Sequence, residues 1–154
     1  MFIWPERWDK PFYDSTFACS SYENCHVPWG NTHEESLLLI KKNDFISGQY
    51  VWTGFDYIGE PTPYGWPARS SYFGIVDLAG FPKDVYYLYQ SEWTDKQVLH
   101  LFPHWNWTEG QDVDMWCYYN QADEVELFVN GKSQGIKSKD DNHLHVSWLS
   151  LIHI

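Results

Sequence analysis

A run of apolar residues with polar flanks predicts a helix near the start of the chain's second quarter. Thr32 precedes the run SLLLIKK, and Glu35 follows it by three positions, which is the pattern of a capping box. Lys41 and Lys42 suit the negative end of the helix dipole. We therefore expect a helix over residues 33–43.

A second helical pattern lies further along the chain. Pro82 fits the first turn of a helix, where its missing N–H is not needed. Val85, Leu88 and Trp93 then fall on one stripe of a helical surface. This pattern predicts a helix over residues 83–93.

Between the two helices, the segment FISGQYVWTGF, residues 45–55, is nearly continuously apolar and rich in β-branched and aromatic residues. Such a run fits a strand buried on both faces, as in a parallel sheet. A helix followed closely by this strand forms one αβ unit. A loop crowded with aromatic rings, carboxylates, glycines and prolines comes next.

In the C-terminal part of the chain, apolar and polar residues alternate with a period of two. The runs VLHLFPHW, VDMWCYYN, EVELFVNGKSQGI and HLHVSW are separated by turn residues, and Asn130 with Gly131 is a strong hairpin signal. The change of period near residues 94–96 predicts a first domain over 1–94 and a β-sandwich over 95–148. About four strands are present where an immunoglobulin-like sandwich has about seven, so we expect the sandwich to be partial.

Composition narrows the class of partner. The chain has 154 residues, of which 19% are aromatic, and its formal net charge is −11. Nucleic acid is excluded as a partner, because its recognition depends on clustered cations. No apolar run reaches the roughly 18 residues that a membrane span needs, so no membrane partner is expected.

Neither a metal nor a cofactor is predicted. The three cysteines, Cys19, Cys25 and Cys117, are odd in number and lack CxxC spacing, so they indicate neither a disulfide framework nor a zinc site. Histidine pairs such as His143 and His145 lack companion ligands.

Both ends of the sequence look cut. Met1 leads directly into FIWPERWDKPFYD, without a helix cap or the charged and apolar segments of a signal peptide, so we expect this start to be the interior of a longer protein. The last six residues, LSLIHI at 149–154, follow a strand-like run without a turn residue and resemble the translated end of a sequencing-library adaptor. We expect them to be a non-native tail and leave them out of the prediction of the fold.

The central and C-terminal motifs resemble one enzyme family. The stretch YVWTGFDYIGEPTPYGWPARSSYFGIVDLAGFPKDVYYLYQSEW resembles the last strand, loop and helix of the catalytic barrel of glycoside hydrolase family 2, most closely its bacterial β-galactosidase-like members. ADEVELFVNGKSQG is similar to the sandwich domain that follows that barrel. The resemblance covers nearly all of residues 1–148.

This resemblance implies a fold of the α/β plus β type: the C-terminal remnant of a (β/α)8 TIM barrel followed by a partial immunoglobulin-like β-sandwich. It implies that the parent protein is a retaining glycosidase that hydrolyses terminal β-galactosides, so the partner is a carbohydrate substrate. The family suggests a periplasmic or secreted parent.

The candidate substrate-binding residues lie on the loop after the barrel strand, where barrel enzymes place their chemistry. A pyranose has a face of C–H groups that packs on an indole ring. The resemblance implies that Trp52 is the floor of the sugar subsite and Asp56 the carboxylate that ends the motif. From the residues alone, Trp52 could instead be core, and Asp56 could hold a structural hydrogen bond, for example with Arg69. Glu60 and Trp66 are further candidates.

The catalytic groups themselves are not found in the sequence. Retaining glycosidases use a nucleophile and an acid/base, two carboxyl groups about 5 Å apart. Neither family motif for them occurs here, and the following residues match neither one: Glu6, Glu23, Glu34, Glu35 and Glu60. We expect both catalytic Glu to precede Met1, in the missing N-terminal portion of the barrel, and the chain alone to be inactive.

Two other interpretations remain open. The chain could be a non-catalytic carbohydrate-binding β-sandwich with an N-terminal extension, in which Trp52 or the group Trp105, Trp107 and Trp116 binds sugar. It could also be a structural module whose rings are core or interface packing.

Overall fold

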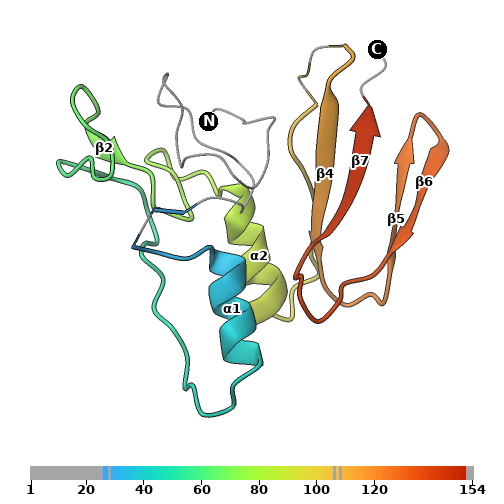
Figure 1. Ribbon diagram of the computed structural model, residues 1–154, viewed down its shortest axis with the longest axis horizontal. Coiled ribbons are helices and arrows are strands. Elements are labelled where there is room, and N and C mark those ends of the chain that lie inside the picture. The colour runs from blue at the N-terminus through green and yellow to red at the C-terminus, as the bar shows by residue number, and fades with distance from the viewer. Residues whose placement is uncertain (1–25, 28, 106, 108, 152–154) are drawn as a thin grey trace. The chain divides into compact units, whose positions relative to one another are not determined.

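The computed structural model describes residues 26–27, 29–105, 107 and 109–151, and it consists mostly of small antiparallel sheets with few helices (Figure 1). The chain divides into two compact units, Met1–Tyr86 and Tyr87–Ile154. Most of the second helix groups with the second unit, so this division falls before the change of sequence period at 94–96. The domain limits 1–94 and 95–148 stay predictions for the parent protein.

Helix α1, His33–Lys41, forms where the sequence predicts it. Its capping box is complete: the Glu35 N–H donates to Thr32 Oγ1 at 3.2 Å, and the Thr32 N–H donates to Glu35 Oε2 at 3.0 Å. Lys42 is the C-cap, so the helix ends two residues earlier than expected. The capping signal is local in the sequence, which explains why it predicts the start well.

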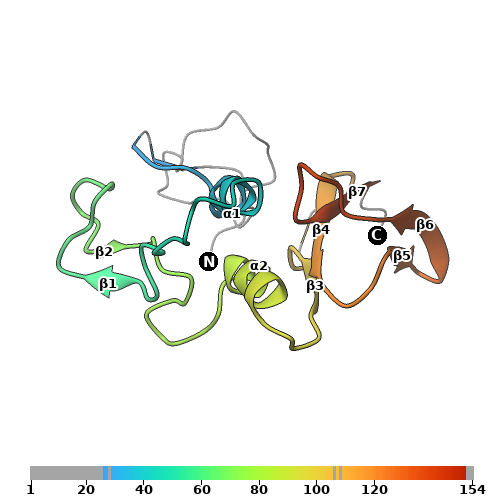
Figure 2. The same cartoon turned by 90° about the horizontal axis from the view of Figure 1, so that it is seen from below.

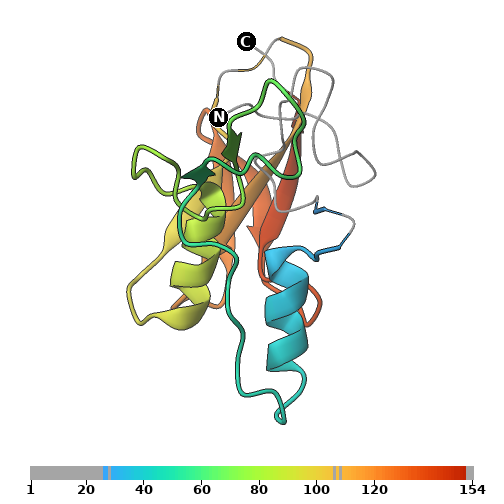
Figure 3. The ribbon, with the colours of Figure 1, turned by 90° about the vertical axis from the view of Figure 1, so that its left-hand side faces the viewer.

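The predicted strand at residues 45–55 is wrong for this structure. The segment runs as an extended trace after α1 (Figure 3), with Phe45 85% exposed and Tyr50 fully exposed. Only its end is paired: Phe55 forms an isolated parallel bridge with Val76. A strand buried on both faces needs neighbours at both edges, and the described residues provide one short neighbour at one edge.

A short hairpin that the sequence did not predict follows this segment. Strand β1, Tyr57–Ile58, pairs antiparallel with β2, Ser70–Ser71, with Tyr57 opposite Ser71. The pair closes a loop over residues 59–69, the part of the sequence that is rich in aromatic residues, glycines and prolines. The two ends of this loop are therefore held together by the strand pair.

The second unit holds most of the regular structure. Helix α2 spans Asp84–Trp93, close to the expected range. Strands β3 (Leu99–Phe102), β4 (Asp112–Tyr119) and β7 (Val146–Leu151) form one antiparallel sheet in the order β3-β4-β7.

The predicted hairpin is confirmed. Strands β5 (Val125–Val129) and β6 (Lys132–Lys137) pair antiparallel around Asn130 and Gly131, which have φ angles of 51° and 75°. Positive φ at both central residues is the conformation for which Asn-Gly is selected.

The hairpin and the three-stranded sheet share a core. Figure 2 looks nearly along the strands and shows the hairpin beside the sheet. Alternate residues of β4 face this core, together with Leu127 from β5 and side chains of β7; the buried members are Val113, Met115, Cys117, Tyr119, Leu127, Val146 and Trp148. Only the start of β4, residues 112–115, alternates polar and apolar residues and so indicates the side that faces the hairpin; residues 115–119 are apolar throughout and indicate neither side.

Strand β7 lies further along the chain than the run HLHVSW suggests. Leu149 pairs with Asp114, and Leu151 pairs with Asp112 at the far end of β4. Residues 149–151, which the prediction of the fold leaves out, thus belong to a strand in this structure. An alternating extended segment next to an open strand edge can pair whatever its origin. A non-native origin stays a prediction.

Candidate functional site

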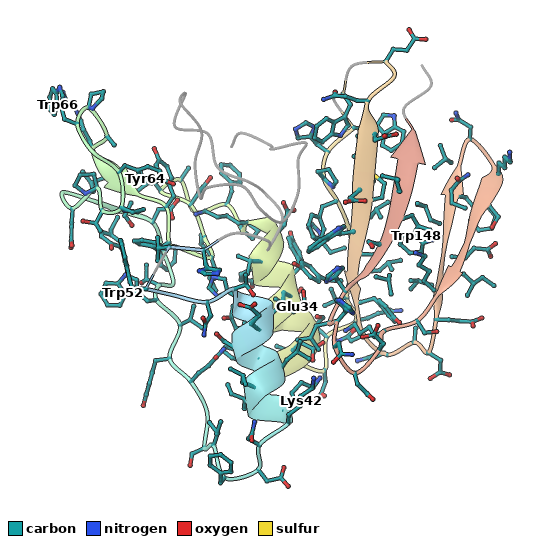
Figure 4. The ribbon with its side chains drawn as sticks, viewed as in Figure 1. Glu34, Lys42, Trp52, Tyr64, Trp66 and Trp148 are labelled. Carbon is teal, nitrogen blue, oxygen red and sulfur yellow. The ribbon has the colours of Figure 1, made fainter. Side chains whose placement is uncertain are left out.

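Trp52 is an exposed ring next to the β1–β2 hairpin (Figure 4). It is 70% exposed, and its Nε1–H donates to Tyr57 Oη at 3.3 Å. The two rings meet edge-to-face, with centroids 6.2 Å apart and planes at 83°. The ring therefore does not belong to the hydrophobic core in this structure, and its orientation is fixed by Tyr57.

The buried carboxylate of Asp56 accepts hydrogen bonds from Lys83 and Gly74. Its side chain is only 2% exposed, and Oδ1 accepts from Lys83 Nζ at 2.6 Å and from the Gly74 N–H at 2.8 Å. Lys83 Nζ also donates to the Tyr72 carbonyl oxygen at 3.0 Å. Burial with two charge-assisted hydrogen bonds is the geometry of a structural anchor.

The ion-pair partner of Asp56 is Lys83 rather than Arg69, which the sequence suggested. Arg69 lies over the ring of Trp66, and Lys83 makes the ion pair with Asp56 instead. Lys83 is separated from Asp56 by 27 positions, and no sequence spacing indicates such a contact. It is the residue of the site that sequence reasoning missed.

Gly74 allows the backbone to close around Asp56. A Cβ at this position would overlap the backbone nitrogen of Asp56 and the carbonyl carbon of Phe55. Glycine is thus required for close approach of the two segments rather than for an unusual φ angle. The same approach lets the Asp56 N–H donate to the Val76 carbonyl oxygen at 2.9 Å.

The loop over residues 59–69 is built on a buried tyrosine. Tyr64 packs edge-to-face on Tyr72, with ring centroids 5.3 Å apart. The Tyr64 N–H donates to the Pro61 carbonyl oxygen at 2.9 Å, and the Gly59 N–H donates to the Arg69 carbonyl oxygen at 3.1 Å. These contacts give the loop a fixed internal structure.

Two side chains of this loop face solvent as a pair. Trp66 is 81% exposed, and the guanidinium carbon of Arg69 lies 5.5 Å from the centroid of its ring. Such a cation–π contact is worth about 0.5–1 kcal/mol at an exposed site. Glu60 is also exposed. The loop thus brings an indole and a cation together without burying either.

Glu34, Glu35 and Glu60 lie in three different surroundings. Glu35 is the capping residue of α1, and Glu34 is buried on the same helix. Glu60 lies on the exposed loop. Glu6 and Glu23 lie outside the described residues.

No metal site or membrane-spanning helix is found in the part of the chain that the structure describes. Three or more His, Cys, Asp or Glu side chains do not gather there in a way that could hold a metal ion. Asp140 instead contacts His143 Nδ1 at 2.9 Å, and the Asn142 N–H and His143 together lower the pKa of the Asp140 carboxyl. None of the described helices is long and apolar enough to cross a membrane. Cys19 and Cys25 lie outside the described residues.

The tryptophans near the second sheet are mostly core. Trp116 is buried and stacks flat on His145, with ring centroids 3.7 Å apart and planes at 7°. Trp107 packs against the core cluster, whereas Trp105 is half exposed. The core interpretation is therefore confirmed for Trp116, and these three rings do not form one sugar-binding surface.

Comparisons with known proteins find relatives that are named as glycosidases. Residues 110–152 match the family model described as "Domain of unknown function (DUF4982)". The chain is 89% identical over 148 residues to "Beta-galactosidase BoGH2A" of Bacteroides ovatus, an alignment that covers 96% of this chain and 17% of that protein. It is 46% identical over 138 residues to a "Putative beta-glucuronidase" of Formosa agariphila, covering 84% of this chain and 13% of that protein.

A solved structure is also similar. The crystal structure of a beta-glycosidase from Bacteroides vulgatus matches with a TM-score of 0.77 and 38% identity, over 88% of this chain and 17% of that chain. This chain thus spans less than a fifth of the length of each of these relatives, with 17%, 13% and 17% covered.

Proposed function

Because the chain belongs to glycoside hydrolase family 2, we propose that it is the region of a retaining β-galactosidase-like enzyme that contributes a sugar-binding loop. In this proposal residues 1–94 are the C-terminal remnant of the (β/α)8 barrel, and residues 95–148 are the start of an immunoglobulin-like β-sandwich. The similarity over 96% of the chain supports this assignment.

The observation that carries the proposal is the exposure of Trp52. An indole that is 70% exposed and oriented by a hydrogen bond to Tyr57 presents a flat apolar face to solvent. The C–H face of a pyranose packs on such a ring. We assign Trp52 to the floor of the subsite for the terminal sugar.

Asp56 enters the proposal as the anchor of this platform. Its carboxylate is buried and already accepts hydrogen bonds from Lys83 and Gly74, which supports a role in holding the loop rather than in touching sugar hydroxyls. Glu60 and Trp66, both exposed, are the remaining candidates for contact with substrate.

The chemistry of the proposed reaction lies outside this chain. Glu35 is a helix cap, Glu34 a buried helical residue and Glu60 an exposed loop residue, and none of these three matches the motifs of the family's nucleophile or acid/base. We propose that both catalytic carboxyl groups belong to the rest of the barrel, so that the chain binds part of the sugar but does not cleave it alone.

The proposed substrate is a terminal β-galactoside. The relative named a beta-galactosidase is 89% identical to this chain, whereas the relative named a putative beta-glucuronidase is 46% identical. A non-catalytic sugar-binding sandwich is less well supported, because Trp116 is buried and Trp107 packs on the core.

Substitution of Trp52 in the full-length enzyme tests this function. Trp52→Ala should lower kcat/KM for a β-galactoside by roughly tenfold to a hundredfold, since it removes a stacking surface worth about 1.5–3 kcal/mol. Trp29→Ala is a matched control, because Trp29 is exposed but lies outside this loop. Normal hydrolysis by Trp52→Ala would remove the sugar-platform role.

A further inference from the structure

Two of the exposed indoles of the first unit, Trp52 and Trp66, lie too far apart to stack on the same sugar ring (Figure 4). Trp52 contacts Tyr57 at the base of the β1–β2 hairpin, whereas Trp66 belongs to the loop that this hairpin closes. Figure 4 shows the two side chains well apart, with Tyr64 on the loop that carries Trp66. If Trp52 receives the terminal sugar, Trp66 needs another ligand.

The exposure of Trp66 is maintained by the structure of its loop. Tyr64 anchors the loop on Tyr72, and the Ala68 N–H donates to the Gly65 carbonyl oxygen at 3.0 Å, which forms a turn around Trp66. Leaving a large aromatic side chain 81% exposed on such a fixed loop forgoes the free energy that its burial would give. An exposed ring held in one place is suited to binding.

The chemistry of cleavage decides which sugar this ring would meet. An enzyme that removes a terminal sugar accommodates a single residue before the cleaved bond, and every other part of the substrate lies on the leaving-group side. We propose that Trp66 and Arg69 form the subsite for the sugar on the leaving-group side, an inference that rests on the function proposed above.

The occupant of this subsite is a neutral pyranose. Arg69 lies over the Trp66 ring, and a guanidinium offers several N–H donors that hydroxyl oxygens accept. The ring supplies the stacking surface for the C–H face of the sugar. Residues 59–69 contain one acidic and one basic residue, Glu60 and Arg69, so the formal charge of the loop is zero, which favours a neutral occupant.

Two substrates that differ only in the leaving group test this inference in the full-length enzyme. Lactose has a pyranose as its leaving group, whereas β-galactosyl fluoride has none that could stack. Trp66→Ala should lower kcat/KM for lactose about tenfold and leave kcat/KM for the fluoride within about twofold of wild type. Arg69→Gln should show the same split with a smaller loss, measured by release of glucose and of fluoride ion.

The outcomes separate this inference from the function on which it rests. Trp29→Ala should leave both substrates unaffected, as expected for an exposed ring elsewhere in the unit. Normal lactose hydrolysis by Trp66→Ala, or equal losses on both substrates in both variants, would overturn the leaving-group subsite alone. A wild-type enzyme that hydrolyses neither substrate would overturn the proposed function and this inference with it.

Discussion

Asp56 and Cys117 show how burial changes the role of a side chain that looks reactive in the sequence. Asp56 is a candidate sugar ligand by its position in the motif, but in the structure its carboxylate is occupied by Lys83 and Gly74. Cys117 lies in the core of the second unit, and burial raises the pKa of its thiol to about 11. A thiol in such surroundings stays protonated and unreactive at neutral pH.

The raised pKa of Cys117 predicts a loss of stability at alkaline pH. The folded thiol titrates near 11 and the unfolded thiol near 9.0, so the unfolded state releases its proton first as the pH rises. The contribution of Cys117 to the free energy of unfolding is therefore constant below pH 9. It falls as the pH rises from 9 through 11, by about 3 kcal/mol at most. Urea unfolding of wild type and Cys117→Ala from pH 8 to 11 measures it.

The difference in unfolding free energy between wild type and Cys117→Ala isolates the effect of the thiol. Tyrosines and lysines also titrate in this range, but they are present in both proteins and cancel in the difference. Cys117→Ala adds a constant cost for the lost packing, which does not depend on pH. Unfolding free energies that run parallel from pH 8 to 11 would contradict the prediction.

Secondary structure was predictable where its signals are local. The capping box of α1, the proline before α2 and the Asn130–Gly131 turn each place an element within two residues of its observed position. The segment 45–55 was misjudged, because a doubly buried strand is defined by neighbours rather than by its own residues. The candidate site shows the same difference between local and distant signals. Its loop is predictable from its own composition, whereas the Asp56–Lys83 ion pair joins residues that are distant in the sequence.

The junction between α2 and the second sheet depends on one amide that no motif indicates. Asn120 Oδ1 accepts from the Val98 N–H at 2.8 Å, and its Nδ2 donates to the Lys96 carbonyl oxygen at 2.8 Å and to those of Ser91 and Thr94 at 3.3 Å. The segment between α2 and β3 is thus tied to the end of β4. Within this unit the Asn120 side chain acts as a clamp, because it holds the segment between α2 and β3 in a fixed conformation.

Removal of this amide should destabilise the second unit. Asn120→Ala leaves the N–H of buried Val98 without its acceptor, so we expect the unfolding free energy to fall by about 1–3 kcal/mol. Gln134→Ala removes an exposed amide that donates to the Lys132 carbonyl oxygen at 3.0 Å on the same strand, and should change stability by less than about 0.5 kcal/mol. Equal effects of the two substitutions on urea unfolding would contradict the clamp.

The two units differ in how well their apolar residues are covered. In β4, the five residues Met115–Tyr119 are all buried. In the first unit, Phe45, Tyr50, Trp52 and Phe55 are all exposed along one extended segment. Exposed apolar side chains along an extended segment that belongs to no strand favour pairing with another chain, which makes residues 45–52 the expected site of self-association.

Net charge opposes this association, and salt should therefore promote it. Copies that each carry a formal charge of −11 repel one another at low ionic strength, whereas at 1 M salt the screening length falls to about 3 Å. We expect hydrogen exchange of the dilute chain at low salt to be fast over residues 45–52, which belong to no strand, and slow over β4, which pairs with β3 and β7. Raising the salt or the concentration should slow exchange over 45–52 as light scattering increases. Protection of 45–52 in dilute, low-salt monomer would show instead that the segment is already paired within its own chain, and would remove the reason to expect association there.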